Sequence, residues 1–262
     1  MKTALYIRQV GDDARPYLNT LVESLHKRGV ETLQVADGDG VDGCDFLLSI
    51  GGDGTLLSSV QFVHSSGPAA FPPILGINFG HLGFLTAAGK ESIATLVDDL
   101  LQGRYTLEER TLLQGDDFLA LNEVFLHRSD EASLLRTEVR VDGDYVATYA
   151  GDGVIVATPT GSTAYSLSCG GPILTPDSRC LVITPVCAHT LTLRPIIVPD
   201  SATVELSIET GGGYTLGIDS RRTACQGPSH FTLRRAPFTI NLVRTGSQSF
   251  FSAIRDKLSW GN

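Results

Sequence analysis

The chain lacks the residue patterns of small extracellular scaffolds, zinc proteins and membrane proteins. Its five cysteines are an odd number and include no C-x-x-C pair, so neither a disulfide framework nor a zinc cluster is expected. No apolar run approaches the roughly 18 residues that span a bilayer. The first apolar run ends at Arg8, too soon for a signal peptide. These absences predict a cytoplasmic protein with reduced thiols and no membrane partner.

Basic residues are also scarce. The chain has 20 Lys and Arg against 29 Asp and Glu, which gives a net charge of -9. An acidic chain repels phosphate backbones, so no nucleic-acid partner is expected. A nucleotide substrate would meet the same repulsion and would need backbone N–H groups, a few arginines or a metal ion. None of the four lysines lies in a Gly-rich turn, which excludes a Walker P-loop.

The first hundred or so residues alternate short apolar runs with helix-like patterns. In residues 12–28, Leu18, Leu21 and Leu25 recur at helical spacing, and Gly29 follows as a helix stop. Residues 45–50 and 73–78 are short apolar runs typical of buried strands. This alternation predicts an α/β domain with an open, mostly parallel sheet.

From about residue 107 the pattern changes to short strands separated by turns. Residues 136–141 and 145–149 alternate around Asp142-Gly143, which predicts a hairpin. Further strand-like runs continue to residue 243, and residues 249–258 have a helical pattern. We predict an α/β domain at 1–105, an all-β, sandwich-like domain at 106–245, and a C-terminal helix at 246–262 that packs on the first domain.

The chemistry is expected at the sequence GGDGT, residues 51–55, between a buried strand and a helix. Ligands of open α/β sheets bind beyond the carboxyl ends of the strands. Glycines permit a close backbone approach, and the next helix N-terminus offers free N–H groups to an anion. Asp53 would repel a phosphate, but it can accept a proton from an attacking hydroxyl or hold a metal that bridges phosphates. The alternative is a tight turn in which Asp53 caps the helix.

Two shorter segments offer weaker candidates. In residues 78–86, which also follow a strand, His81 could donate to a phosphate or fill a turn, and Phe84 could stack on a base or belong to the core. Asn122 and Glu123 place an amide beside a carboxylate at the start of a strand. They could bind a ribose diol or a base edge, or Asn122 could turn the chain beside a solvated Glu123.

The segment 151–172 is rich in Ser, Thr and Gly in the middle of the β region. A core strand gains little from burying Ser and Thr, whereas many donors and small side chains suit a nucleoside. Tyr165 could stack on its base. Farther along, His189 and Arg194 could approach an anion, although each alone is more often structural. Residues 219–222 close a strand with two arginines.

Taken in order, these segments resemble the NAD kinase family. The resemblance rests on GGDGT, on GHLGFLT at 80–86, on the Asn122-Glu123 pair, on TPTGSTAYSLS at 158–168 with a following GGP, and on HTL-x-x-RP at 189–195. GGDGT also occurs in diacylglycerol and sphingosine kinases, whereas the 158–168 motif after a GDG turn is far more specific. The resemblance implies an N-terminal α/β domain, a C-terminal β-sandwich, and a homodimer or homotetramer.

The resemblance further implies phosphorylation of NAD at the 2′-hydroxyl of the adenosine ribose, with ATP and a divalent metal, Mg²⁺, to give NADP. Asp53 would accept the hydroxyl proton, with Gly54 beside it against the dinucleotide. No residue is assigned as a metal ligand. The residues implied in dinucleotide binding are Asn122, Glu123, Asp152, Thr160, Thr163, Ala164, Tyr165, Ser166, Leu167 and Ser168, and further candidates are His81, Phe84, His189 and Arg221.

Three positions depart from the family pattern or vary within it. Arg221 stands where many members have Gln, Ala188 stands where many have Pro, and Ala150 occupies a place that bears on NAD versus NADH preference. Two rival functions stay open. A lipid kinase built on GGDGT would need an apolar cleft, which the polar segment 158–168 does not favour. A non-catalytic NAD(P) sensor would gain nothing from Asp53.

Overall fold

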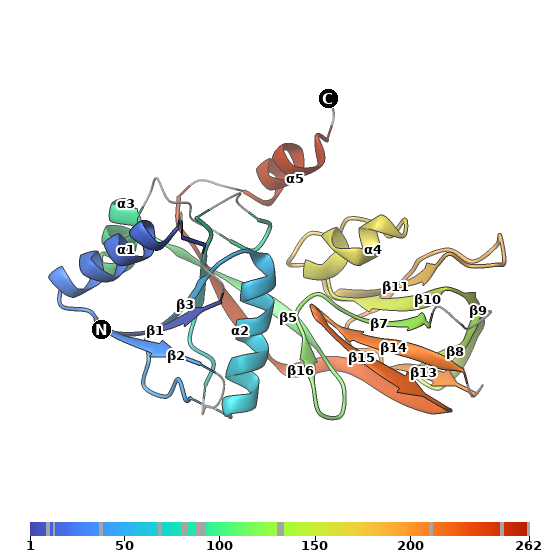
Figure 1. The fold of residues 1–262 in the computed structure, drawn as a ribbon. Helices are drawn as coiled ribbons and strands as arrows, with labels where there is room; N and C mark the ends of the chain where they lie inside the picture. Colours follow the sequence, from blue (N-terminus) through green and yellow to red (C-terminus); the bar gives the residue numbers. More distant parts are fainter. Residues whose placement is uncertain are drawn as a thin grey trace. The chain divides into compact units, whose positions relative to one another are not determined.

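The computed structural model covers the 262 residues and describes all of them except residues 9–10, 13, 37–38, 68–69, 80–82, 87–92, 130–133, 210–211, 247–248 and 261–262. The chain divides into two compact units (Figure 1). The first comprises Met1–Glu109 and Ile240–Asn262, and the second comprises Arg110–Thr239. Among the described residues, no helix has the length and apolar character needed to cross a membrane.

The first unit is built on parallel strands. Its strands lie in the order β2-β1-β3-β4, and each neighbouring pair is parallel. A parallel sheet with helices between its strands is buried on both faces, which explains why every residue of β3 and β4 is buried. The predicted α/β fold is confirmed. The elements are β1 (Lys2–Ile7), α1 (Arg15–Lys27), β2 (Glu31–Val35), β3 (Phe46–Ile50), α2 (Asp53–Ser66), β4 (Ile74–Ile77), α3 (Ile93–Leu101) and α5 (Phe250–Leu258).

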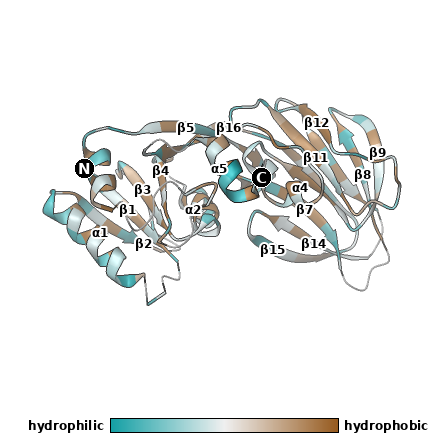
Figure 2. Cartoon of the chain, turned by 90° about the horizontal axis from the view of Figure 1, so that it is seen from above, coloured by the Kyte–Doolittle hydropathy of each residue, from teal (hydrophilic) through white to brown (hydrophobic). Residues whose placement is uncertain are grey.

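One core cluster of the first unit joins strand residues to helices α1 and α3. Leu48 and Ile77 of the sheet pack with Leu25 of α1 and Val97 of α3. The opposite side of α1 is polar, and Figure 2 shows hydrophilic residues along this helix. The spacing of its leucines therefore correctly predicted which face of α1 is buried.

The second unit is an antiparallel β-sandwich. One layer has the order β12-β11-β10-β7-β14-β15, and the other includes β13, β8, β9 and part of β16. Residues of both layers share one core cluster, such as Leu126 and Val154 on one side and Val139 and Leu206 on the other. Figure 2 shows hydrophobic residues along strands of this unit, β11 among them. The predicted all-β sandwich is confirmed.

The strands of this region are β5 (Thr106–Gln114), β6 (Leu119–Ala120), β7 (Glu123–Arg128), β8 (Leu135–Val141), β9 (Asp144–Gly151), β10 (Gly153–Ala157), β11 (Cys180–Val186), β12 (Ile196–Pro199), β13 (Val204–Ile208), β14 (Gly213–Ile218), β15 (Arg221–Gln226) and β16 (Ser229–Arg244). A 3₁₀ turn, η2 (Thr160–Thr163), and a single-turn helix, α4 (Tyr165–Ser168), interrupt them. Strands β5 and β16 each continue from one unit into the other.

The structure differs from the sequence-based strands at two places. β16 is one strand of 16 residues, where the sequence predicts separate runs at 231–233 and 239–243. The strand continues through Pro237, although proline cannot donate to a strand ladder. β15 was not predicted, since its sequence RRTACQ is almost entirely exposed and shows no apolar alternation.

Gly153, at the start of β10, provides a test of this packing. A Cβ at this position would overlap the carbonyl oxygen of Leu126 on neighbouring β7. We expect Gly153→Ala to lower the free energy of unfolding in urea by about 1–3 kcal/mol, because the two strands must separate. Gly40→Ala is the control, since a Cβ there meets nothing within 4 Å. Equal stability of the two variants would contradict the close β7–β10 approach.

Candidate functional site

The Gly-rich turn connects β3 directly to α2. Gly51 has a φ of +146°, and a Cβ there would overlap the side chain of Thr55. The N–H of Gly51 donates to the carbonyl of Ile77 at the end of β4, 2.8 Å away. Gly52 is the N-cap of α2, so the helix begins at Asp53. The sequence thus places a free helix N-terminus at the carboxyl edge of the sheet, as predicted.

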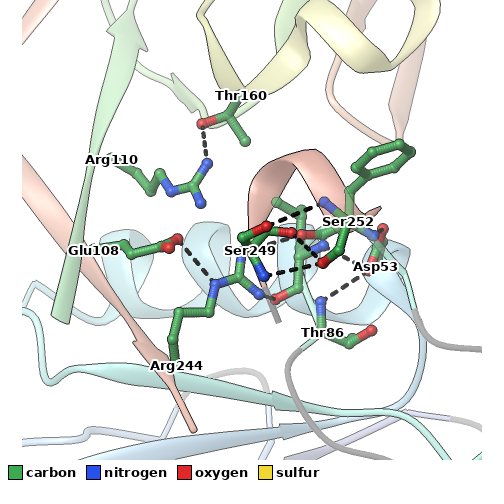
Figure 3. Close-up of polar contacts among 10 residues, drawn as sticks. Asp53, Thr86, Glu108, Arg110, Thr160, Arg244, Ser249 and Ser252 are labelled. Carbon is green, nitrogen blue, oxygen red and sulfur yellow. Dashed lines mark hydrogen bonds and ion pairs between the residues drawn. The ribbon is translucent and has the colours of Figure 1, made fainter. Parts of the chain in front are cut away.

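The Asp53 carboxylate is directed away from the backbone of its own helix. Its oxygens accept the N–H groups of Phe84 at 2.8 Å and of Leu85 and Thr86 at 3.2 Å each. Figure 3 shows the carboxylate facing Thr86. The helix-cap alternative is therefore wrong, because Gly52 and not Asp53 occupies the N-cap position of α2. Since a carboxylate offers about four acceptor positions, these three donors among the described residues leave one for another partner.

The turn at 83–86 is shaped to receive this carboxylate. A Cβ on Gly83 would overlap the Asp53 side chain, so the close approach requires glycine. The N–H of Gly83 donates to the buried Thr86 hydroxyl at 2.7 Å. Phe84 is half-buried and meets Asp53 through its backbone. His81 lies outside the described residues. Residues 51–55 and the turn at 83–86 therefore form one structural element in the first unit.

In the second unit, the Asp219 carboxylate fixes the chain at Asn122 and Glu123. It accepts the N–H groups of Leu121 at 2.9 Å, Asn122 at 2.7 Å and Glu123 at 3.1 Å. Asp219 follows β14 with a φ of +51°, and its own N–H donates to the Glu123 carbonyl at 2.9 Å. Sequence analysis noted residues 219–222 for their arginines and missed this role. Asp219 and its partners are about a hundred residues apart, so no local sequence pattern indicates this contact.

Asn122 and Glu123 are buried, with 9% and 5% of their surface exposed. The alternative of a solvated Glu123 is therefore wrong. Among the described residues, Asn122 Oδ1 and Glu123 Oε2 have no hydrogen-bond partner. A buried polar atom without a partner costs about 1–3 kcal/mol. Since nearly all buried polar atoms are satisfied in folded proteins, a ligand is the expected partner here.

Burial also shifts the acidity of this pair. Burial and, to a lesser extent, the nearby Asp219 together raise the pKa of Glu123 to about 8, although the backbone N–H of Tyr165 opposes the shift. Burial raises the pKa of Asp219 to about 6, against the effect of its three backbone donors and Arg221. At neutral pH, Glu123 is therefore mainly protonated and able to donate a hydrogen bond, while Asp219 is mainly ionised.

The hydroxyl groups of segment 158–168 largely serve the protein itself. Ser162 donates to the Pro159 carbonyl at 2.7 Å and accepts the N–H of Leu174 at 3.0 Å. The Ser166 and Thr184 hydroxyls lie 2.8 Å apart and are both buried. These contacts hold η2 and α4 in place. The interpretation of these residues as a row of free donors is therefore too simple.

The same segment packs directly against Asn122. The N–H of Thr158 donates to the Asn122 carbonyl at 2.9 Å, and a Cβ on Gly161 would overlap that carbonyl. Thr160 accepts from the Arg110 guanidinium at 3.4 Å, and Thr163 donates to the Thr160 carbonyl at 3.3 Å. The 158–168 motif and the Asn122-Glu123 pair, separate in sequence, therefore form one site in the second unit.

Aromatic residues lie beside this site. The rings of Tyr165 and Phe125 meet edge to face, with centroids 5.2 Å apart. The Arg222 guanidinium carbon lies 5.9 Å from the Phe125 centroid. Of the other predicted residues, Ala164 and Leu167 are half-buried and Ser168 is exposed. The Tyr165 ring is therefore anchored on one edge and half-buried.

The remaining predicted residues are farther along the second unit. Asp152 pairs with Arg128 at 2.7 Å, and this hydrogen bond lowers the pKa of Asp152. His189 is exposed, and its backbone N–H donates to the Ala150 carbonyl at 2.8 Å. Arg221 is exposed at the start of β15.

A resident metal cage is not found in the described part of the chain, where no three His, Cys, Asp or Glu residues are grouped as ligands. Mg²⁺ is usually held by one or two carboxylates, several waters and the phosphates of a substrate. A single carboxylate with a remaining acceptor position, as at Asp53, fits a metal that enters with a nucleotide.

Comparisons with known proteins agree on one family. Residues 12–105 match the ATP-NAD kinase N-terminal domain, and residues 121–245 match the ATP-NAD kinase C-terminal domain. An NAD kinase of Flavobacterium psychrophilum is 40% identical over 228 residues, which cover 83% of this chain and 76% of that protein. An NAD kinase of Christiangramia forsetii is 34% identical and covers 100% of this chain and 98% of its own.

Solved structures give the same result. An NAD kinase from Archaeoglobus fulgidus in complex with ATP has a TM-score of 0.81 at 26% identity, and covers 99% of this chain and 98% of its own. Yeast NADH kinase complexed with NADH has a TM-score of 0.89 at 23% identity, over 100% of this chain and 88% of its own. At 23% identity, the likeness to the yeast enzyme shows a shared fold only.

The raised pKa of Glu123 makes stability depend on pH. The folded state favours the protonated carboxyl, so the stability that Glu123 contributes is present below its ordinary pKa of 4.5 and is lost as the pH rises through about 8. We expect Glu123→Gln to gain stability relative to the original chain between about pH 5 and pH 9. Urea unfolding at several pH values measures this difference. A difference in stability that stays constant with pH would contradict the shift.

Proposed function

The chain belongs to the ATP-NAD kinase family and is a phosphotransferase, and we propose that it transfers the γ-phosphoryl group of ATP to the 2′-hydroxyl of the adenosine ribose of NAD, giving NADP. The observation that carries this proposal is the pair of buried polar atoms, Asn122 Oδ1 and Glu123 Oε2, that lack a partner in the described part of the chain. They lie against segment 158–168, which is the most family-specific motif of the sequence.

Asn122 and Glu123 hold the dinucleotide in this proposal. The Asn122 oxygen accepts from a hydroxyl or amine, and the protonated Glu123 donates to a hydroxyl or a ring nitrogen. Tyr165 offers its ring to a base. Support comes from their burial and from the anchoring of their backbone by Asp219. The other residues proposed to line the site are Gly54, Asp152, Thr160, Thr163, Ala164, Ser166, Leu167 and Ser168.

Asp53 accepts the proton of the 2′-hydroxyl as the phosphoryl group is transferred. A ribose hydroxyl is a poor nucleophile at neutral pH, and an oriented carboxylate that takes its proton assists attack. The three backbone donors fix the carboxylate and leave an acceptor position for the hydroxyl. The N-terminus of α2 adds N–H groups that favour a phosphate. Mg²⁺ bound with ATP would neutralise charge on the phosphates.

The resemblance also predicts a homodimer or homotetramer, a cytoplasmic location, and roles for His81, Phe84, His189 and Arg221 in substrate binding. These stay predictions. Among them, Arg221 is exposed and lies two residues after Asp219, where its guanidinium could meet a substrate phosphate.

Replacement of Asp53 tests the proton acceptor. An Asn side chain has the same shape but cannot take the proton, so Asp53→Asn should lower kcat by roughly 100- to 10,000-fold while NAD still binds. A coupled assay of NADP formation from NAD, ATP and Mg²⁺, repeated with NADH and diacylglycerol as acceptors, measures this.

The matched control is Asp45→Asn, whose carboxylate also accepts a backbone N–H, from Lys2, at 2.7 Å in the first unit. It should keep near-normal turnover. Near-normal turnover of Asp53→Asn would contradict the role of Asp53 as proton acceptor. Faster turnover of diacylglycerol than of NAD would contradict NAD as the substrate.

Replacement of Asn122 tests the dinucleotide site. Asn122→Ala removes a buried acceptor, so we expect the Kd for NAD to rise by roughly 5- to 150-fold, corresponding to about 1–3 kcal/mol. Calorimetric titration with NAD measures the loss. The exposed Asn19→Ala serves as control. An unchanged Kd would remove Asn122 from the site.

A further inference from the structure

Arg244, the last residue of β16, lies on the opposite side of the 83–86 turn from Asp53. Its side chain is 16% exposed. The Nη1 group donates to the Leu85 carbonyl and the Nη2 group to the Phe84 carbonyl, each at 3.1 Å. Nε donates to Glu108 Oε2 at 2.9 Å, and Figure 3 shows this pair beside the Asp53 cluster. All of these residues belong to the first unit.

Two complete peptide groups connect the guanidinium to the carboxylate. In the peptide between Phe84 and Leu85, the carbonyl accepts from Arg244 and the N–H donates to Asp53. The peptide between Leu85 and Thr86 is oriented in the same way. Each peptide dipole therefore points its positive end at the anion and its negative end at the cation. Hydrogen bonds in such a chain polarise and strengthen one another.

We propose that Arg244 is a positioning residue for Asp53, acting through these two peptide groups; this rests on the proposed function of Asp53 as proton acceptor. The planar guanidinium holds both carbonyls at once, and Glu108 fixes its orientation. With the turn held, the three N–H groups keep the carboxylate in one rotamer. Without Arg244 the turn is held from one side only, and the carboxylate loses its orientation while the dinucleotide site is untouched.

Arg244→Met tests this role, with Arg104→Met as the matched control. Arg104 pairs with Asp99 at 2.7 Å in the same unit. We expect Arg244→Met to lower kcat about 10- to 100-fold with little change in the KM for NAD, since misplacement of a catalytic group affects the chemical step. Arg244→Lys keeps the charge but cannot bridge both carbonyls, so it should restore activity only in part.

A double-mutant cycle separates positioning from a general structural role. If Arg244 acts through Asp53, Arg244→Met should have little further effect on kcat in the Asp53→Asn background. An equal loss in both backgrounds would overturn the proposal, as would an unchanged kcat in the single variant. Should Arg244→Met fail to fold, Arg244→Lys and Glu108→Gln, which keep side-chain volume, are measured in the same cycle with the same two outcomes.

Hydrogen exchange provides a readout that does not need turnover. The amides of Phe84, Leu85 and Thr86 should exchange faster in Arg244→Met than in Arg104→Met, because the clamp on the turn is removed. If the original chain makes no NADP, the proposed function fails, and the exchange rates still test whether Arg244 holds the turn. If NADP is made but neither exchange nor kcat changes, the positioning role is wrong and the proposed function stands.

Discussion

The site depends on carboxylates that each accept three consecutive backbone N–H groups, and both units contain such a carboxylate. Asp53 binds the amides of residues 84–86, and Asp219 binds those of residues 121–123. Hydrogen bonds to an ionised acceptor are about twice as strong as neutral ones. A single side chain thus fixes the path of a distant segment. In the first unit, the carboxylate itself has the proposed chemical role. In the second unit, the segment that the carboxylate fixes is proposed to bind the dinucleotide.

The two carboxylates differ in their burial and in their proposed roles. Asp219 is buried, and its carboxylate oxygens accept backbone N–H groups. Among the described residues, the side chains of Asn122 and Glu123 each have one buried atom without a partner. Asp53 is only partly buried and keeps an acceptor position of its own. Burial leaves Glu123 protonated at neutral pH and able to donate. An acidic chain can in this way offer donors and dipoles to a phosphorylated substrate without adding positive charge.

The sequence predicted what depends on local pattern. The parallel sheet, the sandwich and the position of Asp53 after a buried strand follow from apolar periodicity and from glycines before a helix. It could not show that Asp219 holds residues 121–123, because the partners are about a hundred positions apart. It also could not show that the hydroxyls of Ser162 and Ser166 make contacts within the protein, since nothing in a Ser-rich segment distinguishes a donor aimed at a ligand from one that holds its own turn.

The glycines of the motifs explain why these segments must be interpreted together. Gly83 is required because the Asp53 carboxylate occupies the space of a side chain, and Gly161 because the Asn122 carbonyl does. Each glycine is therefore required by a group that lies elsewhere in the sequence. GGDGT at 51–55 could belong to several kinase families when it is considered alone. In contact with the 83–86 turn, its Asp53 carboxylate is held in one orientation. The acceptor of the phosphoryl group is inferred from the buried atoms of Asn122 and Glu123 in the other unit.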